Sequence, residues 1–197
     1  NMITKNALQI FYLTLICTFF STKISAQDSI NTSSITVRSL NKFKLYLIGI
    51  GVEREQKITK SSTVYFGLAV ESVVPFFPQS PPNASDILRI SHAINLAPVY
   101  YVGFKKYYNL QERAETAKTI ANNSGSFFGF EYDLIAPILI KNLYTTGYVS
   151  SFSPIWGLQR NTLKHTNIEF MIGPSYQTDY NRHRISLLAK IGFNYLL

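Results

Sequence analysis

The sequence predicts an all-β protein, an eight-stranded antiparallel up-and-down transmembrane β-barrel that is preceded by a cleaved signal peptide. Three observations predict it: a short apolar segment near the start, alternation of period two through the rest of the chain, and polar strand faces made mostly of small residues. The chain of 197 residues has room for one such domain, and its 14 Phe and 13 Tyr exceed what a disordered chain carries. We expect a signal peptide over residues 1–27 and a barrel domain over residues 28–197.

The N-terminal segment has the three parts of a secretory signal. Lys5 precedes an apolar run from Ala7 to Phe20, and the small-residue stretch Ile24 to Gln27 follows. The run spans 14 residues, whereas a transmembrane helix needs about 20. This pattern predicts export and cleavage just after Ala26 or Gln27.

Seven segments read as strands. They are 43–53, 62–72, 96–105, 125–135, 148–160, 167–177 and 184–197. The last is the clearest, because Ile185, Leu187, Ala189, Ile191, Phe193, Tyr195 and Leu197 alternate with polar or small residues. Pro98 and Pro154 fit poorly at central positions of a sheet, because proline has no N–H group to donate to a neighbouring strand. The segment from Ile30 to Arg38 supplies a weak eighth strand, which matters because bacterial single-chain barrels use an even number.

The composition of the polar faces indicates which face points outward. A water-facing strand surface carries many charges of both signs, whereas these faces are mostly Gly, Ser, Thr, Ala and Asn. Small residues with a few opposite charges suit the narrow interior of an eight-stranded barrel. The charged residues expected there are Glu71, Lys105, Glu131, Asp133, Glu169 and Lys190. Unpaired charges would be very costly in such an interior, so we expect an internal ion-pair network that fixes strand register or, alternatively, forms an ion or proton path.

The signal peptide, the hairpins and a final strand ending in Phe193, Tyr195 and Leu197 resemble the small outer-membrane β-barrel proteins of Gram-negative bacteria, the OmpA-like and OmpX-like class. The Gly-x-Glu/Gln-Arg hairpins and the insertion from Tyr107 to Gly125 resemble an uncharacterised group of outer membrane protein beta-barrel domains. This resemblance implies integration in the outer membrane, contact with its lipid and lipopolysaccharide, and recognition of the last strand by the barrel-insertion machinery. The chain departs from the class by ending on Leu197, where an aromatic residue is usual.

The same resemblance implies that the C-terminal end faces the periplasm. The turns 54–61, 109–124 and 161–166 then lie on that side, and the connections 75–94, 137–147 and 179–183 face outward. Within the second turn, Leu110 to Ala121 has helix-forming composition and the sequence Asn-Asn-Ser-Gly follows it, so we expect a short helix or an ordered turn there.

The Pro-rich loop from Pro75 to Ile94 is the candidate binding loop for a surface ligand or protein. Its candidate contact residues are Phe76, Phe77, Arg89 and His92. The alternative is a loop packed over the barrel mouth by its own aromatic side chains.

The sequence gives little indication of catalysis or metal binding. One Cys and three scattered His favour neither a disulfide nor a metal site. The possible catalytic groups are Ser91, His92 and Asp86 in one loop and Asp179 with His183 in another, but no spacing makes them converge. The formal net charge is +8, yet Lys and Arg are dispersed among hairpin turns, which argues against nucleic-acid binding.

We therefore expect a monomer that is not an enzyme and needs no cofactor. Its expected role is structural, or surface interaction through extracellular loops. The alternatives are a soluble secreted ligand-binding barrel and a narrow pore.

Overall fold

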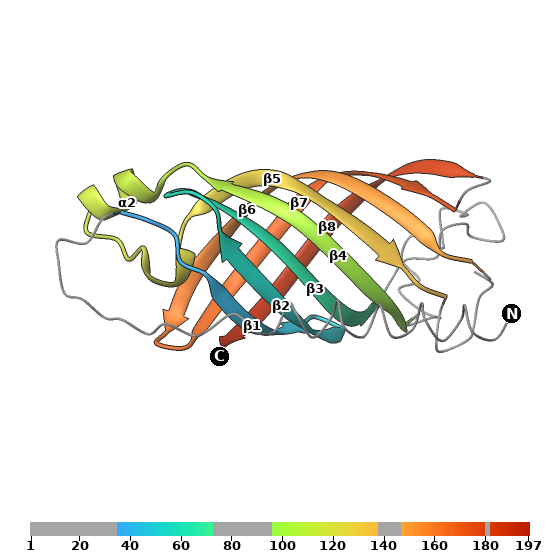
Figure 1. Cartoon of the computed structure of the whole chain (residues 1–197), viewed down its shortest axis with the longest axis horizontal. Coiled ribbons are helices and arrows are strands. Elements are labelled where there is room, and N and C mark those ends of the chain that lie inside the picture. The colour runs from blue at the N-terminus through green and yellow to red at the C-terminus, as the bar shows by residue number, and fades with distance from the viewer. Residues whose placement is uncertain (1–34, 73–95, 138–146, 180–181) are drawn as a thin grey trace, which may run out of the picture. The chain divides into compact units, whose positions relative to one another are not determined.

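The computed structural model describes residues 35–72, 96–137, 147–179 and 182–197. They form a closed antiparallel barrel in which each strand pairs with the next and β8 pairs with β1 (Figure 1). The strands are β1 (Leu40–Tyr46), β2 (Gly49–Lys57), β3 (Ser62–Ser72), β4 (Leu96–Tyr107), β5 (Ser126–Ile135), β6 (Val149–Leu163), β7 (Thr166–Thr178) and β8 (His183–Leu196). The prediction of an all-β, eight-stranded up-and-down barrel is confirmed. The expected signal peptide, residues 1–27, lies outside the described residues.

The first hairpin corrects the predicted strand pattern. The segment 43–53, predicted as one strand, is divided by a turn at Leu47 and Ile48 into β1 and β2. The weak eighth strand predicted at 30–38 is wrong in its described part, because residues 35–39 are not in a strand. The sequence does not predict this turn, because the turn is apolar and lacks the Asn-Gly or Asp-Gly pair typical of two-residue hairpins.

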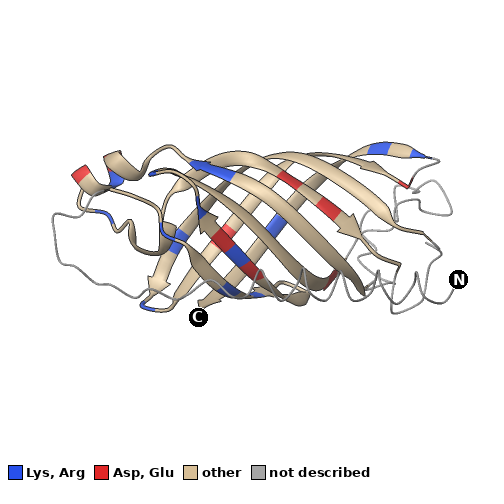
Figure 2. Ribbon diagram, viewed as in Figure 1, with Lys and Arg blue, Asp and Glu red and all other residues tan. Residues whose placement is uncertain are grey.

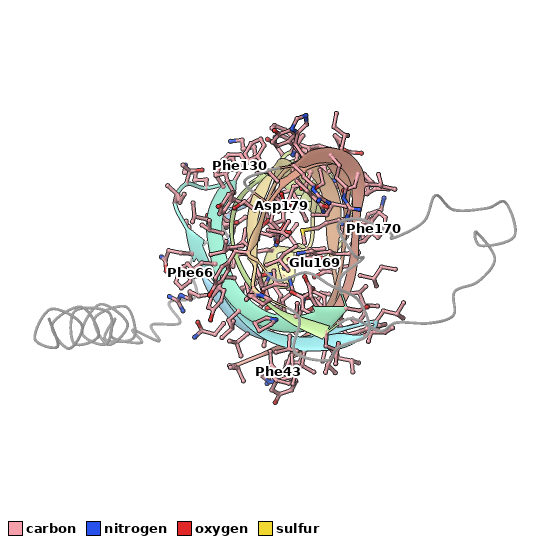
Figure 3. All side chains as sticks on the ribbon, turned by 90° about the vertical axis from the view of Figure 1, so that its right-hand side faces the viewer. Phe43, Phe66, Phe130, Glu169, Phe170 and Asp179 are labelled. Carbon is pink, nitrogen blue, oxygen red and sulfur yellow. The ribbon has the colours of Figure 1, made fainter. Side chains whose placement is uncertain are left out.

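Apolar side chains cover the outside of the barrel and polar ones fill the inside. On β5, Phe130 is 46% exposed whereas the next residue, Glu131, is 1% exposed. Figure 3 shows Phe43, Phe66, Phe130 and Phe170 pointing away from the barrel wall while Glu169 lies within it. This is the sidedness that the small-residue polar faces predict.

The connections gather at two ends. The C-terminal end carries Leu197 and the connections 58–61, 108–125 and 164–165, and the opposite end carries the turn 47–48 and the described residues Asp179 and Arg182. The three connections at the C-terminal end are grouped as predicted, whereas the turn 47–48 was not predicted, and the connection 75–94 and most of 137–147 lie outside the described residues. The short helix predicted within 110–121 is present as α2 (Leu110–Glu115), and a 3-10 turn, η1 (Ala121–Asn123), follows it.

Seven buried apolar side chains form one cluster that includes residues of the C-terminal end, such as Val37 and Leu110, and Leu188 beside the mouth cavity. They are Val37, Tyr107, Leu110, Phe127, Ile155, Met171 and Leu188. Val37 precedes β1 and Leu110 begins α2, so this packing ties the chain before β1 to the β4–β5 connection. The lumen therefore contains a packed apolar cluster in addition to its polar side chains.

Candidate functional site in the lumen and at its open mouth

Three lysines and three glutamates form the centre of the lumen, and we call this set the three-lysine network. Lys42 and Lys44 come from β1, Lys105 from β4, Glu53 and Glu55 from β2, and Glu169 from β7. Glu169 contacts all three lysines. Its carboxylate oxygens lie 3.0 Å from the ammonium of Lys105, 3.1 Å from that of Lys42 and 3.3 Å from that of Lys44. Each of the six side chains is at most 1% exposed. The charges balance, and Figure 2 shows basic and acidic segments on neighbouring strands.

Neutral polar groups complete this network. The hydroxyls of Thr63 and Tyr107 each donate to Glu55 Oε1 at 2.9 Å. The ammonium of Lys42 also donates to Gln159 Oε1 at 3.1 Å. Buried charges need such partners to offset the cost of leaving water. The network therefore fills the cross-section with fixed side chains.

A second cluster, the Lys190 cluster, lies toward the opposite end. The Lys190 ammonium is 2.9 Å from Glu131 Oε1, 3.0 Å from Asp133 Oδ1 and 3.3 Å from Glu71 Oε1. The Tyr65 hydroxyl donates to Glu131 Oε2 at 2.8 Å. Three carboxylates thus surround one ammonium, so the Lys190 cluster taken by itself has an excess of negative charge.

Tyr101 lies between the two clusters. The Lys190 ammonium is 5.4 Å from the centre of the Tyr101 ring, and the Lys44 ammonium is 5.8 Å from it. Gly67 makes room for this ring, because a Cβ at position 67 would overlap the ring carbon Cζ and the hydroxyl of Tyr101. The glycine on the inner face of β3 is therefore a packing requirement.

A cavity of about 570 Å³ opens beyond the Lys190 cluster. Its charged lining residues are Glu71, Asp133, Arg184 and Lys190, and its neutral polar ones include Ser72, Ser151, Ser175, Gln177 and Ser186. The Ser151 hydroxyl donates to Asp133 Oδ2 at 3.1 Å and is 3.1 Å from the Ser175 hydroxyl. The apolar part of the lining includes Leu47, Ile48 and Leu187.

The C-terminal end of the lumen is closed in a different way. Asn123, from η1, uses its side-chain amide nitrogen to donate to Glu55 Oε1 at 2.9 Å and to the backbone oxygen of Arg38 at 2.8 Å. Its side-chain oxygen accepts from the Arg38 backbone nitrogen at 2.7 Å. The β4–β5 connection and the segment before β1 are thereby fastened across this end, so the described barrel is a cup with one open mouth.

All six charged residues that the sequence assigns to the interior lie there, divided between the two groups. Lys105 and Glu169 belong to the three-lysine network, and the Lys190 cluster holds the other four. Four further interior charges, Lys42, Lys44, Glu53 and Glu55, were not predicted from the sequence. Each strand of the first hairpin, taken separately, alternates with period two and places these residues on its inner face. The prediction of one continuous strand over 43–53 hid this alternation.

The other candidate residues have different outcomes. Phe76, Phe77, Arg89 and His92 of the candidate binding loop lie outside the described residues, as do Asp86 and Ser91. Asp179 Oδ1 accepts from the Arg182 backbone nitrogen at 2.8 Å, and the His183 ring stacks on Tyr176. Phe193, Tyr195 and Leu197 are exposed on the outer face of the last strand and its end.

Within the described ranges, no group of His, Cys, Asp and Glu side chains is arranged to hold a metal ion. No helix in the same ranges is both long enough and apolar enough to cross a membrane. The geometry defines a closed β-barrel with a charged, filled lumen and one open mouth. No protein-family profile, curated protein or solved structure matches the chain.

Proposed function

We propose that this protein is an integral outer-membrane β-barrel with a filled lumen, whose role is structural or consists of surface interactions at its open mouth. The observation that carries the proposal is the inverted distribution of side chains, with apolar residues outside and ion pairs inside. A barrel in water would place its charges outside, whereas a barrel in lipid needs an apolar outer band.

The outer surface fits this environment in detail. Tyr132, Phe152 and Tyr176 are opposite one another on neighbouring strands, and each is at least 40% exposed. Arg54, Lys106 and Arg160 face outward near the C-terminal end. Long basic side chains at such a position reach toward lipid head groups while their stems cover apolar surface. The aromatic row and the basic residues therefore suit an apolar band and its interface.

The filled lumen favours this role over a pore. The side chains of Lys42, Glu53, Glu55 and Lys105 are fully buried in the middle of the barrel. An ion crossing the barrel would have to displace several paired charges together. We therefore infer that the protein does not conduct, and that its interactions take place at the mouth.

The proposal is tested by cell fractionation combined with heat-modifiability. We expect the protein in the outer-membrane fraction, and we expect unboiled and boiled samples to migrate differently on an SDS gel. A soluble protein whose mobility is unchanged by boiling would overturn the proposal in favour of a secreted ligand-binding barrel. Single-channel recording in planar bilayers then tests the filled lumen, and steady conductance would replace the proposed role with that of a narrow pore.

A further inference from the structure

One edge of β8 is left open at the mouth. β8 pairs with β7 along its length, from Thr166 opposite Tyr195 to Thr178 opposite His183. Its pairing with β1 ends at Tyr46 opposite Gly192. In Figure 1 the β7–β8 hairpin accordingly reaches farther to the right than the β1–β2 hairpin. Among the described residues, no strand pairs with residues 185–191 on the β1 side.

The direction of the backbone groups along this edge follows from the hydrogen bonds at the end of the chain. The Leu197 backbone nitrogen donates to the backbone oxygen of Asn41 in β1, and that of Leu196 donates to the backbone oxygen of His165, which precedes β7. Successive residues of a strand alternate in this direction, and the β7–β8 register has no shift. Ile185, Leu187 and Ala189 therefore direct their N–H and C=O groups away from β7, into the space beyond the first hairpin. Such a row of backbone groups is a template for another strand.

The cavity adjoins this open edge. Leu187 and Ala189 line it together with Glu71, Asp133 and Lys190. Counted with Arg184, which also lines the cavity, three carboxylates (Glu71, Glu131 and Asp133) face two cations. The described charges therefore leave one carboxylate in excess, which favours an additional cation. The Ser186 hydroxyl, which also lines the cavity, is buried and has no hydrogen-bond partner among the residues that the structure describes. A donor and an acceptor site are thus available beside the edge.

β1 shows what kind of strand fits next to β8. It pairs with the last part of β8, points Lys42 and Lys44 at lumen carboxylates, and leaves Phe43 and Leu45 on the outer face. A strand that continues this pairing along Ile185 to Ala189 would direct its inward side chains into the cavity.

We propose that the free edge of β8 and the adjoining cavity bind an extended peptide strand of a partner protein, which pairs with the backbone of Ile185 to Ala189 and places a Lys or Arg side chain beside Glu71 and Asp133. The inference deepens the proposed surface role, and it rests on that role for access of a partner to the mouth. Backbone pairing supplies affinity in strand addition, and side-chain pockets supply specificity. A small amine would use only the carboxylates and leave the edge groups unpaired.

The test uses the purified full-length protein folded in zwitterionic micelles and followed by NMR of its backbone amides. The probe is the capped peptide Leu-Asn-Lys-Phe-Lys-Leu-Tyr, which has the sequence of β1. The control peptide carries Glu in place of both lysines. We expect the lysine peptide to shift the amide signals of Leu187 and Ala189 and to slow their hydrogen exchange, and we expect the glutamate peptide to do neither.

Two pairs of variants test separately the contribution of backbone pairing at the edge of β8 and that of the cavity carboxylates. Ala189→Pro removes an N–H that faces the open edge and leaves the β7 ladder intact, whereas Ala189→Val keeps this N–H. Glu71→Gln removes a cavity carboxylate, whereas Glu115→Gln removes an exposed one on α2. We expect Ala189→Pro and Glu71→Gln each to weaken binding by about tenfold or more, and their controls to bind as the parent does.

Three results would overturn the inference: equal binding of both peptides, unchanged binding by Ala189→Pro, or equally tight binding of capped lysine alone. The last result would assign the cavity to small amines. Heat-modifiability of the same samples shows that each variant is folded. A folded barrel that fails to bind thus refutes the strand-addition site alone, whereas a result against membrane location comes from fractionation and refutes the proposed function.

Discussion

Tyr65 and Gly103 face each other across the β3–β4 pair, and the tyrosine ring occupies the space that a side chain at position 103 would need. The ring is fully buried, and its hydroxyl donates to Glu131 Oε2 at 2.8 Å. The glycine thus allows Tyr65 to lie across the lumen and reach a carboxylate on β5. This relationship links strand pairing to the paired charges near the mouth.

Gly103→Ala is expected to destabilise the barrel. The added methyl group overlaps the Tyr65 ring and forces its hydroxyl away from Glu131, and overpacking of this kind costs about 1–3 kcal/mol. The measurement is the urea midpoint of unfolding in micelles. Gly192→Ala is the matched control, because a Cβ there has its nearest neighbour at 3.5 Å. Equal midpoints for the two variants would contradict the assigned packing.

Glu169→Gln is expected to cost about 3–5 kcal/mol, because it leaves three buried lysines facing two carboxylates. The readout is the temperature at which the folded, SDS-resistant band disappears. Glu115→Gln, on the exposed surface of α2, should change this temperature little. Adding Lys105→Met to Glu169→Gln should restore part of the loss, since it removes one uncompensated charge. Equal effects of Glu169→Gln and Glu115→Gln would show that the network does not stabilise the fold.

Asn123→Gly is expected to loosen the closed end of the cup. The backbone at position 123 has a φ of 59°, which glycine adopts without strain, so the variant isolates the loss of the side-chain hydrogen bonds to Arg38 and Glu55. We expect faster hydrogen exchange at the Arg38 amide and a loss of about 1–3 kcal/mol. Asn122→Gly is the control, since its φ of 52° is similar. The same exchange rate in both variants would contradict the role given to Asn123.

Phe130→Lys distinguishes a barrel in lipid from a barrel in water. Phe130 lies in the middle of β5 on the outer face. A lysine at the bilayer midplane costs about 2–4 kcal/mol, whereas the same change on a water-facing surface is usually within about 0.5 kcal/mol. We expect a large loss of stability in lipid vesicles, with Phe130→Leu remaining close to the parent. A neutral or stabilising effect of the lysine would count against membrane insertion.

The sequence was sufficient for the strands whose outer face is uninterrupted. On β5 and β8, bulky apolar residues alternate with small or charged ones, so period two gives both the strand and its inner face. The six interior charges found this way lie on β3, β4, β5, β7 and β8.

The first hairpin shows where this reasoning stops. In a continuous strand, Lys44 and Glu53 fall on opposite faces, because their positions differ by an odd number. The two-residue turn at Leu47 and Ile48 changes the parity, so both side chains point inward and lie 2.7 Å apart. An apolar turn flanked directly by apolar residues leaves little trace in the pattern, and four of the six residues of the three-lysine network were missed with it. The open edge of β8 was equally hidden, because it depends on the difference in length between β1 and β8.

The seam between β1 and β8 has a consequence for assembly. Glu169 finds Lys42 and Lys44 at positions 127 and 125 residues away in the sequence, and both lysines lie on the strand that closes the circle. A sheet still open at this seam holds Glu169 away from both of these lysines and leaves it with Lys105 as its one basic partner among the described residues. Joining the first strand to the last and completing the set of lysines around Glu169 are therefore a single cooperative event. An intermediate that is still open at this seam is penalised twice, by its free strand edges and by the missing lysine contacts of Glu169, and this favours all-or-none closure of the barrel.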